Sequence, residues 1–180
     1  MNRTVATAVA AAALLLGLTS CSSGKTGTAA ATPRSSAKSG ASASPSAVGE
    51  PLTAASAFTG ISRAVPAVKL SGTVTAEDDP NDLLGRPHQY TSKVTFSDSR
   101  ISADDVSGTE KDGVERGGSI EVFATAADAK TRATYIQDVT KGMPALTEYD
   151  YVNGTVLVRV SHYLTPEQAA EYKSAVDALG

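Results

Sequence analysis

The chain has no tryptophan, one cysteine and two histidines among 180 residues, and only 5% of its residues are aromatic. A single cysteine excludes an internal disulfide bond and a zinc site built from cysteines. Basic residues are not in excess, with Lys+Arg 16 against Asp+Glu 19. No basic stripe is available to neutralise phosphates, so we do not expect nucleic acid as a partner.

Motifs of common catalytic sites are also missing. There is no Gly-x-Ser-x-Gly elbow, no His-Glu-x-x-His helix and no glycine-rich phosphate loop. The histidines, His88 and His162, stand in no recognisable catalytic neighbourhood, and the acidic groups at 77–82 and 104–105 lack the spacing of a calcium loop. We therefore expect no enzyme, no cofactor and no metal site.

Aromatic residues are confined to one part of the chain, since all six tyrosines and three phenylalanines come after residue 57. Residues 22–51 are mainly Ser, Ala, Gly, Thr and Pro. Such a segment cannot bury enough apolar surface to offset the entropy of ordering it, so we expect a disordered tether. Residues 52–180, with twelve basic and eighteen acidic side chains, are the predicted folded domain.

The N-terminus is organised like a secretory signal. Arg3 precedes a nearly continuous apolar run at 5–18. The run is too short to span about 30 Å of hydrocarbon at 1.5 Å per residue, but it fits a signal's apolar region. The small residues Thr19 and Ser20 follow, and then Cys21. A plain secretory signal with an unmodified Cys21 is the alternative interpretation.

The sequence Leu18-Thr19-Ser20-Cys21 resembles the lipobox of bacterial lipoproteins. The resemblance implies that residues 1–20 are a lipoprotein signal peptide. It also implies that Cys21 becomes the first residue of the mature chain and carries diacylglycerol on its sulfur. Two or more acyl chains such as palmitate give stable anchoring. The expected location is the outer face of the cell membrane, with the membrane itself as a partner.

Six short segments carry a second resemblance: Asp79-Pro80-Asn81, Leu84-Gly85-Arg86-Pro87, Tyr90-Thr91-Ser92-Lys93, Gly118-Ser119-Ile120-Glu121-Val122-Phe123, Tyr135-Ile136-Gln137 and Glu148-Tyr149-Asp150-Tyr151. They are similar to small lipoproteins of high-GC Gram-positive bacteria. The similarity covers most of residues 65–180 and implies the same envelope location. That group has no established activity, so it assigns no functional residue.

The domain is expected to contain two helices and four to five strands. One helix begins after the cap Thr125 and ends before Gly142, and the other opens with the capping box of Thr165 and Gln168. Strands are expected at 89–96 and 119–123, with a further one at 68–75, and residues 103–118 are expected to form a polar loop. The predicted fold class is α+β, an antiparallel sheet of four to five strands with the two helices packed on one face.

A hairpin is predicted around Asn153-Gly154, the pair that type I′ turns favour. Centring the turn there pairs Tyr151 with Val156 and places Glu148 opposite Arg159, as an ion pair on the solvent side. The apolar face of the hairpin then carries Tyr149, Tyr151, Val156, Val158 and Val160. In the strand at 89–96, alternation predicts a shared face for Tyr90, Val94 and Phe96.

The densest group of polar functional side chains is at residues 79–93. The candidate ligand or partner contacts there are Asp79, Asn81, Arg86, His88, Tyr90 and Lys93. Polar loops often hold binding sites, and Arg86 suits bidentate recognition of a carboxylate or phosphate. In the alternative interpretation, Arg86 pairs with Asp79 or Asp82 and only locks the turn, while Asp78 or Asp79 caps a short helical turn.

Together these features predict a membrane-anchored extracytoplasmic lipoprotein with a small, non-enzymatic binding domain. The expected ligand is an envelope protein, a wall polymer or a small molecule. Two alternatives remain: a small envelope enzyme that uses Arg86 and His88, and a purely structural envelope component. The ligand hypothesis requires the 79–93 loop to open onto a pocket with convergent polar groups.

Overall fold

The computed structural model describes residues 51–180. The predicted signal peptide, Cys21 and nearly all of the predicted tether lie outside the described residues. The described part contains five strands, β1 (Val68–Thr73), β2 (Tyr90–Asp98), β3 (Gly117–Phe123), β4 (Glu148–Asn153) and β5 (Val156–Ser161). Its helices are α1 (Ala54–Ala64), α2 (Ala126–Thr140) and α3 (Pro166–Asp177), with the short 3₁₀ helices η1 (Val114–Arg116) and η2 (Pro144–Leu146). Within 51–180, no helix has both the length and the apolar composition needed to cross a bilayer.

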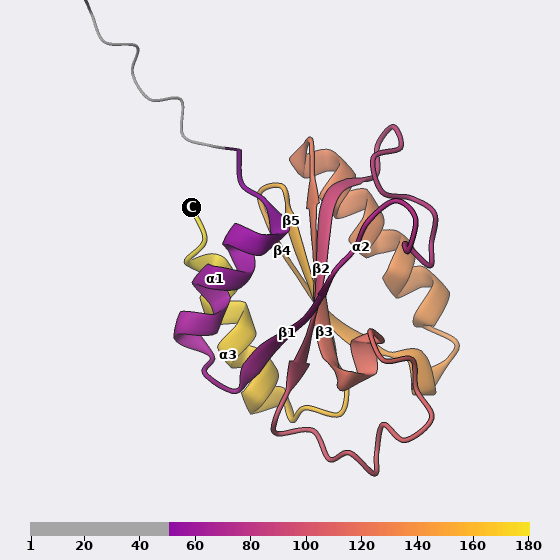
Figure 1. Cartoon of the computed structure of the whole chain (residues 1–180), viewed down its shortest axis with the longest axis vertical. Helices are drawn as coiled ribbons and strands as arrows, with labels where there is room; N and C mark the ends of the chain where they lie inside the picture. Colours follow the sequence, from indigo (N-terminus) through magenta and orange to yellow (C-terminus); the bar gives the residue numbers. More distant parts are fainter. Residues whose placement is uncertain (1–50) are drawn as a thin grey trace, which may run out of the picture. The chain divides into compact units, whose positions relative to one another are not determined.

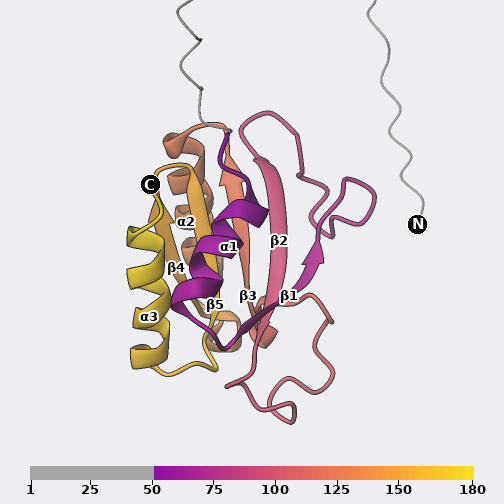
Figure 2. The same ribbon diagram turned by 60° about the vertical axis from the view of Figure 1, so that its left-hand side comes forward.

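The strands form a single antiparallel sheet in the order β1-β2-β3-β5-β4. This confirms the predicted fold class. Helices α1 and α3 lie side by side on one face of the sheet, and α2 covers part of the other (Figures 1 and 2). Two helices do share one face, but the pair predicted from the sequence, α2 and α3, lies on opposite faces.

The face under α1 and α3 is apolar. Alternation along the strands places one set of large side chains there: Val94, Phe96, Ile120, Val122, Val156, Val158 and Val160. Ala54, Ala57 and Ile61 of α1 pack onto them, together with Tyr172 and Val176 of α3. This layer is the main hydrophobic core.

The face under α2 begins with a second, smaller apolar cluster. Ala129, Ala133 and Ile136 of α2 pack on Tyr90, Phe123 and Leu157 of the sheet. Tyr90 reaches this face because the register of β2 against β3 shifts between Tyr90 and Ser92, as a β-bulge does. The predicted common face of Tyr90, Val94 and Phe96 is therefore wrong for Tyr90.

The hairpin of β4 and β5 has the predicted faces but a different turn. Asn153 pairs with Val156 and Tyr151 with Val158, so the loop is Gly154-Thr155, with positive φ at Gly154. Asn153 is held in the strand because its side-chain amide donates to the carbonyls of Val176 (2.8 Å) and Leu179 (2.7 Å) at the end of α3. The predicted pairing of Tyr151 with Val156 is wrong by this one-residue shift of the turn.

Candidate functional site: a polar cavity on the sheet

The α2 side of the sheet changes from apolar to polar beyond Leu157. In the register, Lys93 of β2 pairs with Glu121 of β3. In the next row, Thr95 pairs with Ser119, Ser119 with Arg159, and Arg159 with Asp150. Each of these side chains alternates with residues that point into the main core, so strand periodicity alone brings them to one face.

Glu121 is the centre of a buried ion cluster. Its side chain is fully buried, and its Oε1 lies 3.4 Å from Lys93 Nζ and 3.5 Å from Arg159 Nη1. Its Oε2 lies 3.3 Å from Nε of Arg132, which reaches over from α2. Three cations thus share one carboxylate. The free-energy cost of removing these charges from water is offset only if each charge keeps its partner.

Arg159 is also held from β4. Its Nε and Nη2 donate to Glu148 at 2.7 and 2.9 Å, so the predicted ion pair forms. It forms diagonally, since Asp150 is the residue opposite Arg159. The pair is also buried rather than on the solvent side, because further elements cover this face of the hairpin. Burial would lower the pKa of Arg159, but Glu148 holds that pKa above its usual value.

Asp150 is the least satisfied member of this face. Both of its carboxylate oxygens are buried, and neither has a hydrogen-bond partner among the described residues. Burial, and then the neighbouring Glu148 carboxylate, raise the pKa of Asp150 to about 7, although Arg159 opposes the shift. Asp150 therefore keeps its proton to a higher pH than an exposed aspartate does.

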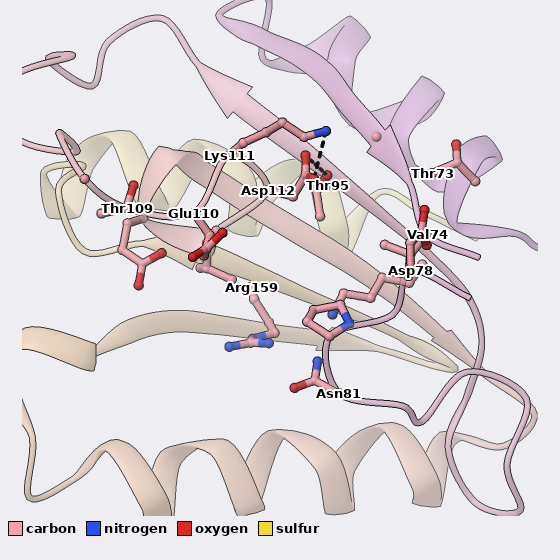
Figure 3. Close-up of a pocket in the computed structure, with 17 residues that line it drawn as sticks. Thr73, Val74, Asp78, Asn81, Thr95, Thr109, Glu110, Lys111, Asp112 and Arg159 are labelled. Atoms are coloured by element: carbon pink, nitrogen blue, oxygen red, sulfur yellow. Dashed lines mark hydrogen bonds and ion pairs between the residues drawn. The ribbon is translucent and has the colours of Figure 1, made fainter. Parts of the chain in front are cut away.

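Beside this cluster the sheet is hollowed into a cavity of about 940 Å³. The strand residues Lys93, Thr95 and Arg159 line its floor. Its walls come from two loops, residues 74–81 and 108–115 (Figure 3). Asn81 and Asp78 stand on the first loop, while Glu110 and Asp112 stand on the second (Figure 3). The fold therefore opens a site where α2 does not cover the polar half of the sheet.

The floor of the cavity carries donors that the protein uses little. Lys93 is 5% exposed, and its ammonium contacts Glu121 Oε1 in an ion pair at 3.4 Å. Its other close neighbour is the ring of Tyr90, whose centroid is 5.1 Å from Nζ. The Thr95 hydroxyl has only a contact with Asp112 Oδ1, at 3.5 Å, among the described residues. Its neighbour Ser119 does not line the cavity, and the buried Ser119 hydroxyl has no partner in the described part.

The walls of the cavity are acidic. Four carboxylates line it, from Asp78, Glu110, Asp112 and Glu115, and Lys111 is the one loop cation among the lining residues. Lys111 pairs with Asp112 at 3.2 Å. No aromatic side chain lines the cavity. Cations at the floor are therefore faced by carboxylates at the walls.

Two of the predicted contacts, Asp79 and Tyr90, build the loop rather than the cavity surface. The Tyr90 hydroxyl donates to both oxygens of Asp79, at 2.8 and 2.6 Å. Asp79 also accepts from the backbone N–H groups of Leu83 (2.8 Å) and Leu84 (2.9 Å), as a capping carboxylate does. Burial raises the pKa of Asp79, but these hydrogen bonds together hold it below its usual value.

Arg86 and His88 lie outside the cavity lining. The Arg86 side chain is 57% exposed and pairs with Asp82, which is the turn-locking alternative considered above. The His88 side chain is 84% exposed, and its Nδ1 lies 3.0 Å from Asp128 at the start of α2. Neither side chain therefore contributes to the cavity that Lys93 lines.

Of the six predicted contacts, the structure brings Asn81 and Lys93 to one cavity and leaves the other four elsewhere. Sequence reasoning missed Thr95, Arg159 and the whole 108–115 wall. A signal for Arg159 and Glu121 was available, because each is a charge flanked by apolar residues inside a central strand. No local signal identifies the 108–115 loop, since only the tertiary fold brings it to β2.

No protein-family model, no curated protein and no solved structure matches this chain. In residues 51–180, no group of three or more His, Cys, Asp or Glu side chains has a geometry that could hold a metal ion.

Proposed function

We propose that this chain is a lipid-anchored protein of the bacterial envelope whose folded domain binds a small polar ligand without catalysis. The observation that carries the proposal is the cavity of about 940 Å³ with the buried Lys93 ammonium at its floor. Ligand sites are concave, largely pre-formed and few per protein. The anchor rests on the lipobox resemblance at Leu18–Cys21.

The same observation favours binding over a purely structural role. The Lys93 ammonium is nearly buried, and it shares the Glu121 Oε1 atom, at 3.4 Å, with Arg159. Donors that such a contact leaves unused are unfavourable for folding unless something else accepts from them. Lys93 lines the cavity, so a ligand there would supply further acceptors for its remaining donors.

A catalytic role has less support. The two residues considered for it, Arg86 and His88, are exposed, paired with Asp82 and Asp128, and absent from the cavity lining. No histidine or cysteine lines the cavity to act as a base or nucleophile. Binding without chemistry is the function that these residues support best.

Amide chemical shifts test the binding site. The full chain with Cys21→Ser, labelled with ¹⁵N, would be titrated with glycylglycine, N-acetylglucosamine, inorganic phosphate and ethanolamine. At least one probe should shift the amides of Lys93, Thr95 and residues 108–115. Asn81→Trp, at the cavity wall, should abolish the shifts, whereas Thr134→Trp on the exposed side of α2 should not. If no probe moves those amides, the cavity is not a ligand site.

Intact-mass measurement tests the anchor. Full-length protein expressed in a bacterium that processes lipoproteins should lose residues 1–20 and carry diacylglycerol on Cys21. It should partition into detergent with the membranes. Cys21→Ser should stay in the aqueous phase. A mature chain that begins elsewhere, or an unmodified thiol at Cys21, would refute the anchored location.

A further inference from the structure

Charge in the cavity is separated by depth. The cations Lys93 and Arg159 come from strands at the floor and are 5% exposed and, for the side chain of Arg159, 15% exposed. The carboxylates Asp78, Glu110 and Asp112 come from loops and are exposed. A ligand that enters therefore meets acceptors first and donors last.

The two floor cations converge on one point. Lys93 Nζ and Arg159 Nη1 both approach the same atom, Glu121 Oε1, at 3.4 and 3.5 Å, so their tips are near neighbours. A lysine ammonium has three donors, and the single ion pair of Lys93 with Glu121 Oε1 can engage one of them. Arg159 uses Nε and Nη2 for Glu148, which leaves Nη1 as its weakly held donor.

The Thr95 hydroxyl extends this group of donors, and Ser119 lies next to it without lining the cavity. Thr95 and Ser119 are paired across β2 and β3, and Ser119 is paired with Arg159 across β3 and β5. Thr95 has one long contact, at 3.5 Å, and Ser119 has no partner in the described part of the chain. A carboxylate offers acceptor-only oxygens, which is the chemistry that such a set of donors lacks.

The acidic wall supplies the opposite chemistry. The carboxylates of Asp78 and Asp112 stand on different loops on either side of the cavity (Figure 3). Asp112 shares its charge with Lys111, whereas Asp78 has only the backbone N–H of Thr75 as a partner, at 2.6 Å. An ammonium group would be stabilised between these loops.

We infer that the cavity takes a small zwitterion, with its carboxylate toward Lys93 and Arg159 and its ammonium at the acidic wall. This is the chemistry of a free amino acid or a short peptide with both ends unblocked. The inference rests on the proposed function, because it assigns a ligand class to the same cavity.

Other ligand classes fit less well. No aromatic side chain is present to stack on a sugar ring or a base. A polyanion would be repelled by the four wall carboxylates. The volume is at the upper end of cavities that hold drug-sized molecules, which leaves room for a short peptide.

Calorimetric titration of the full chain with Cys21→Ser tests the inference with matched probes. Glycylglycine has both charges, N-acetylglycylglycine lacks the ammonium, and glycylglycinamide lacks the carboxylate. Each blocked peptide should bind about tenfold more weakly than glycylglycine, because each loses charge-assisted hydrogen bonds. Phosphoethanolamine, a zwitterion with a phosphate in place of the carboxylate, should also bind more weakly.

Substitutions at the floor of the cavity test where the carboxylate of the ligand binds. Lys93→Met should abolish the preference for glycylglycine over glycylglycinamide. Arg132→Met is the matched control, because Arg132 contacts the same Glu121 but does not line the cavity. If Lys93→Met does not fold, Thr95→Val removes a floor donor without a change in charge and should weaken glycylglycine about tenfold.

Several outcomes would overturn the inference. If the blocked peptides bind as tightly as glycylglycine, the ligand need not be a zwitterion. If phosphoethanolamine binds as tightly as glycylglycine or more tightly, the floor recognises a phosphate rather than a carboxylate. Cavity shifts produced only by N-acetylglucosamine or inorganic phosphate would refute the zwitterion while the proposed function stood. Absence of any cavity shift with any probe would refute both.

Discussion

The two faces of the sheet are built from the same strands but differ in polarity and in how completely they are covered. One face is mainly apolar and is covered by α1 and α3, with Asp98 at its edge accepting from the Tyr172 hydroxyl. The other is apolar only beneath part of α2, around Leu157, and then carries Lys93, Glu121 and Arg159. Stability is therefore expected to depend mainly on the first face, and binding on the second.

This difference explains why the polar face can hold a cavity. A sheet with one mainly hydrophobic face already has a core, so the opposite face is free to be incompletely covered. The ion cluster around Glu121 keeps that face ordered, because Arg132 ties α2 to it and Arg159 joins β5 to β4 through Glu148. The predictions below test this division of roles, from the largest expected effect to the smallest.

Removing a large side chain from the apolar face should have the largest effect. Phe96 is buried and stacks on Tyr172, with ring centroids 5.7 Å apart. Phe96→Ala should lower the free energy of unfolding by about 4 kcal/mol, because it leaves a cavity in the main core. Leu70→Ala is the control, since Leu70 pairs with Phe96 but is 43% exposed. Urea unfolding measures both, and equal effects would contradict an ordered core at Phe96.

Removing the shared carboxylate of the polar face should have the second largest effect. Glu121→Gln leaves Lys93, Arg132 and Arg159 without a common counter-ion, at a cost of about 3 kcal/mol. The exposed Glu110, changed to Gln, should change the free energy of unfolding little. An unchanged urea midpoint for Glu121→Gln would show that the cluster does not hold this face together.

The polar face should also contain one group that destabilises the fold. Burial raises the pKa of Asp150 from 3.8 to about 7. The folded state thus holds a proton on Asp150 that the unfolded state loses at lower pH, so ionisation between about pH 4 and 7 lowers stability. Asp150→Asn should raise the free energy of unfolding at pH 8 by about 2 kcal/mol.

The same variant should match the parent protein at pH 4, where the carboxyl group is largely neutral. Urea unfolding from pH 4 to 8 measures how the gap opens, and the exposed Asp104, changed to Asn, should show none. A loss of stability in Asp150→Asn at pH 8 would mean that ionised Asp150 is satisfied by Arg159.

Tyr90→Phe should have a smaller effect, confined to one wall of the cavity. The variant keeps the ring packed on Phe123 but leaves Asp79 without its two hydroxyl contacts. A loss of about 1 kcal/mol is expected. Hydrogen exchange at the amides of Leu83 and Leu84, which donate to Asp79, should accelerate more than exchange in β5. Uniform acceleration would mean that Tyr90 supports the whole fold rather than the loop.

Local signals in the sequence predicted most of the secondary structure. The caps Thr125 and Thr165 act as expected, and each accepts from a backbone N–H three residues later. Helix α1 was missed although Thr53 and Ser56 form a capping box, because its buried residues are mostly alanines beside a Ser/Ala-rich segment. The turn at 153–154 was misplaced because Asn153 bonds to α3, a contact that the local sequence does not contain.

The site was less predictable than the fold, for a physical reason. Asn81 and Lys93 belong to the segment whose composition indicated binding, but the other floor cation, Arg159, comes from β5. Alternation predicted that Arg159 shares a face with Glu148, and solvent exposure was assumed for that face. Helix α2 and two long loops cover this face and bury it. Which elements cover a face is decided by the tertiary fold and cannot be read from the local sequence.

The smallest effect is expected on the outer side of the 79–93 loop. Arg86→Ala removes a surface ion pair with Asp82 and should change the free energy of unfolding by less than about 0.5 kcal/mol. It should leave glycylglycine binding unchanged, because Arg86 does not line the cavity. Lys93→Met, in the same segment, should change glycylglycine binding because Lys93 lines the cavity. Calorimetric titration of both variants separates the two sides of the loop. A binding defect in Arg86→Ala as large as that in Lys93→Met would move the site from the sheet to the loop surface.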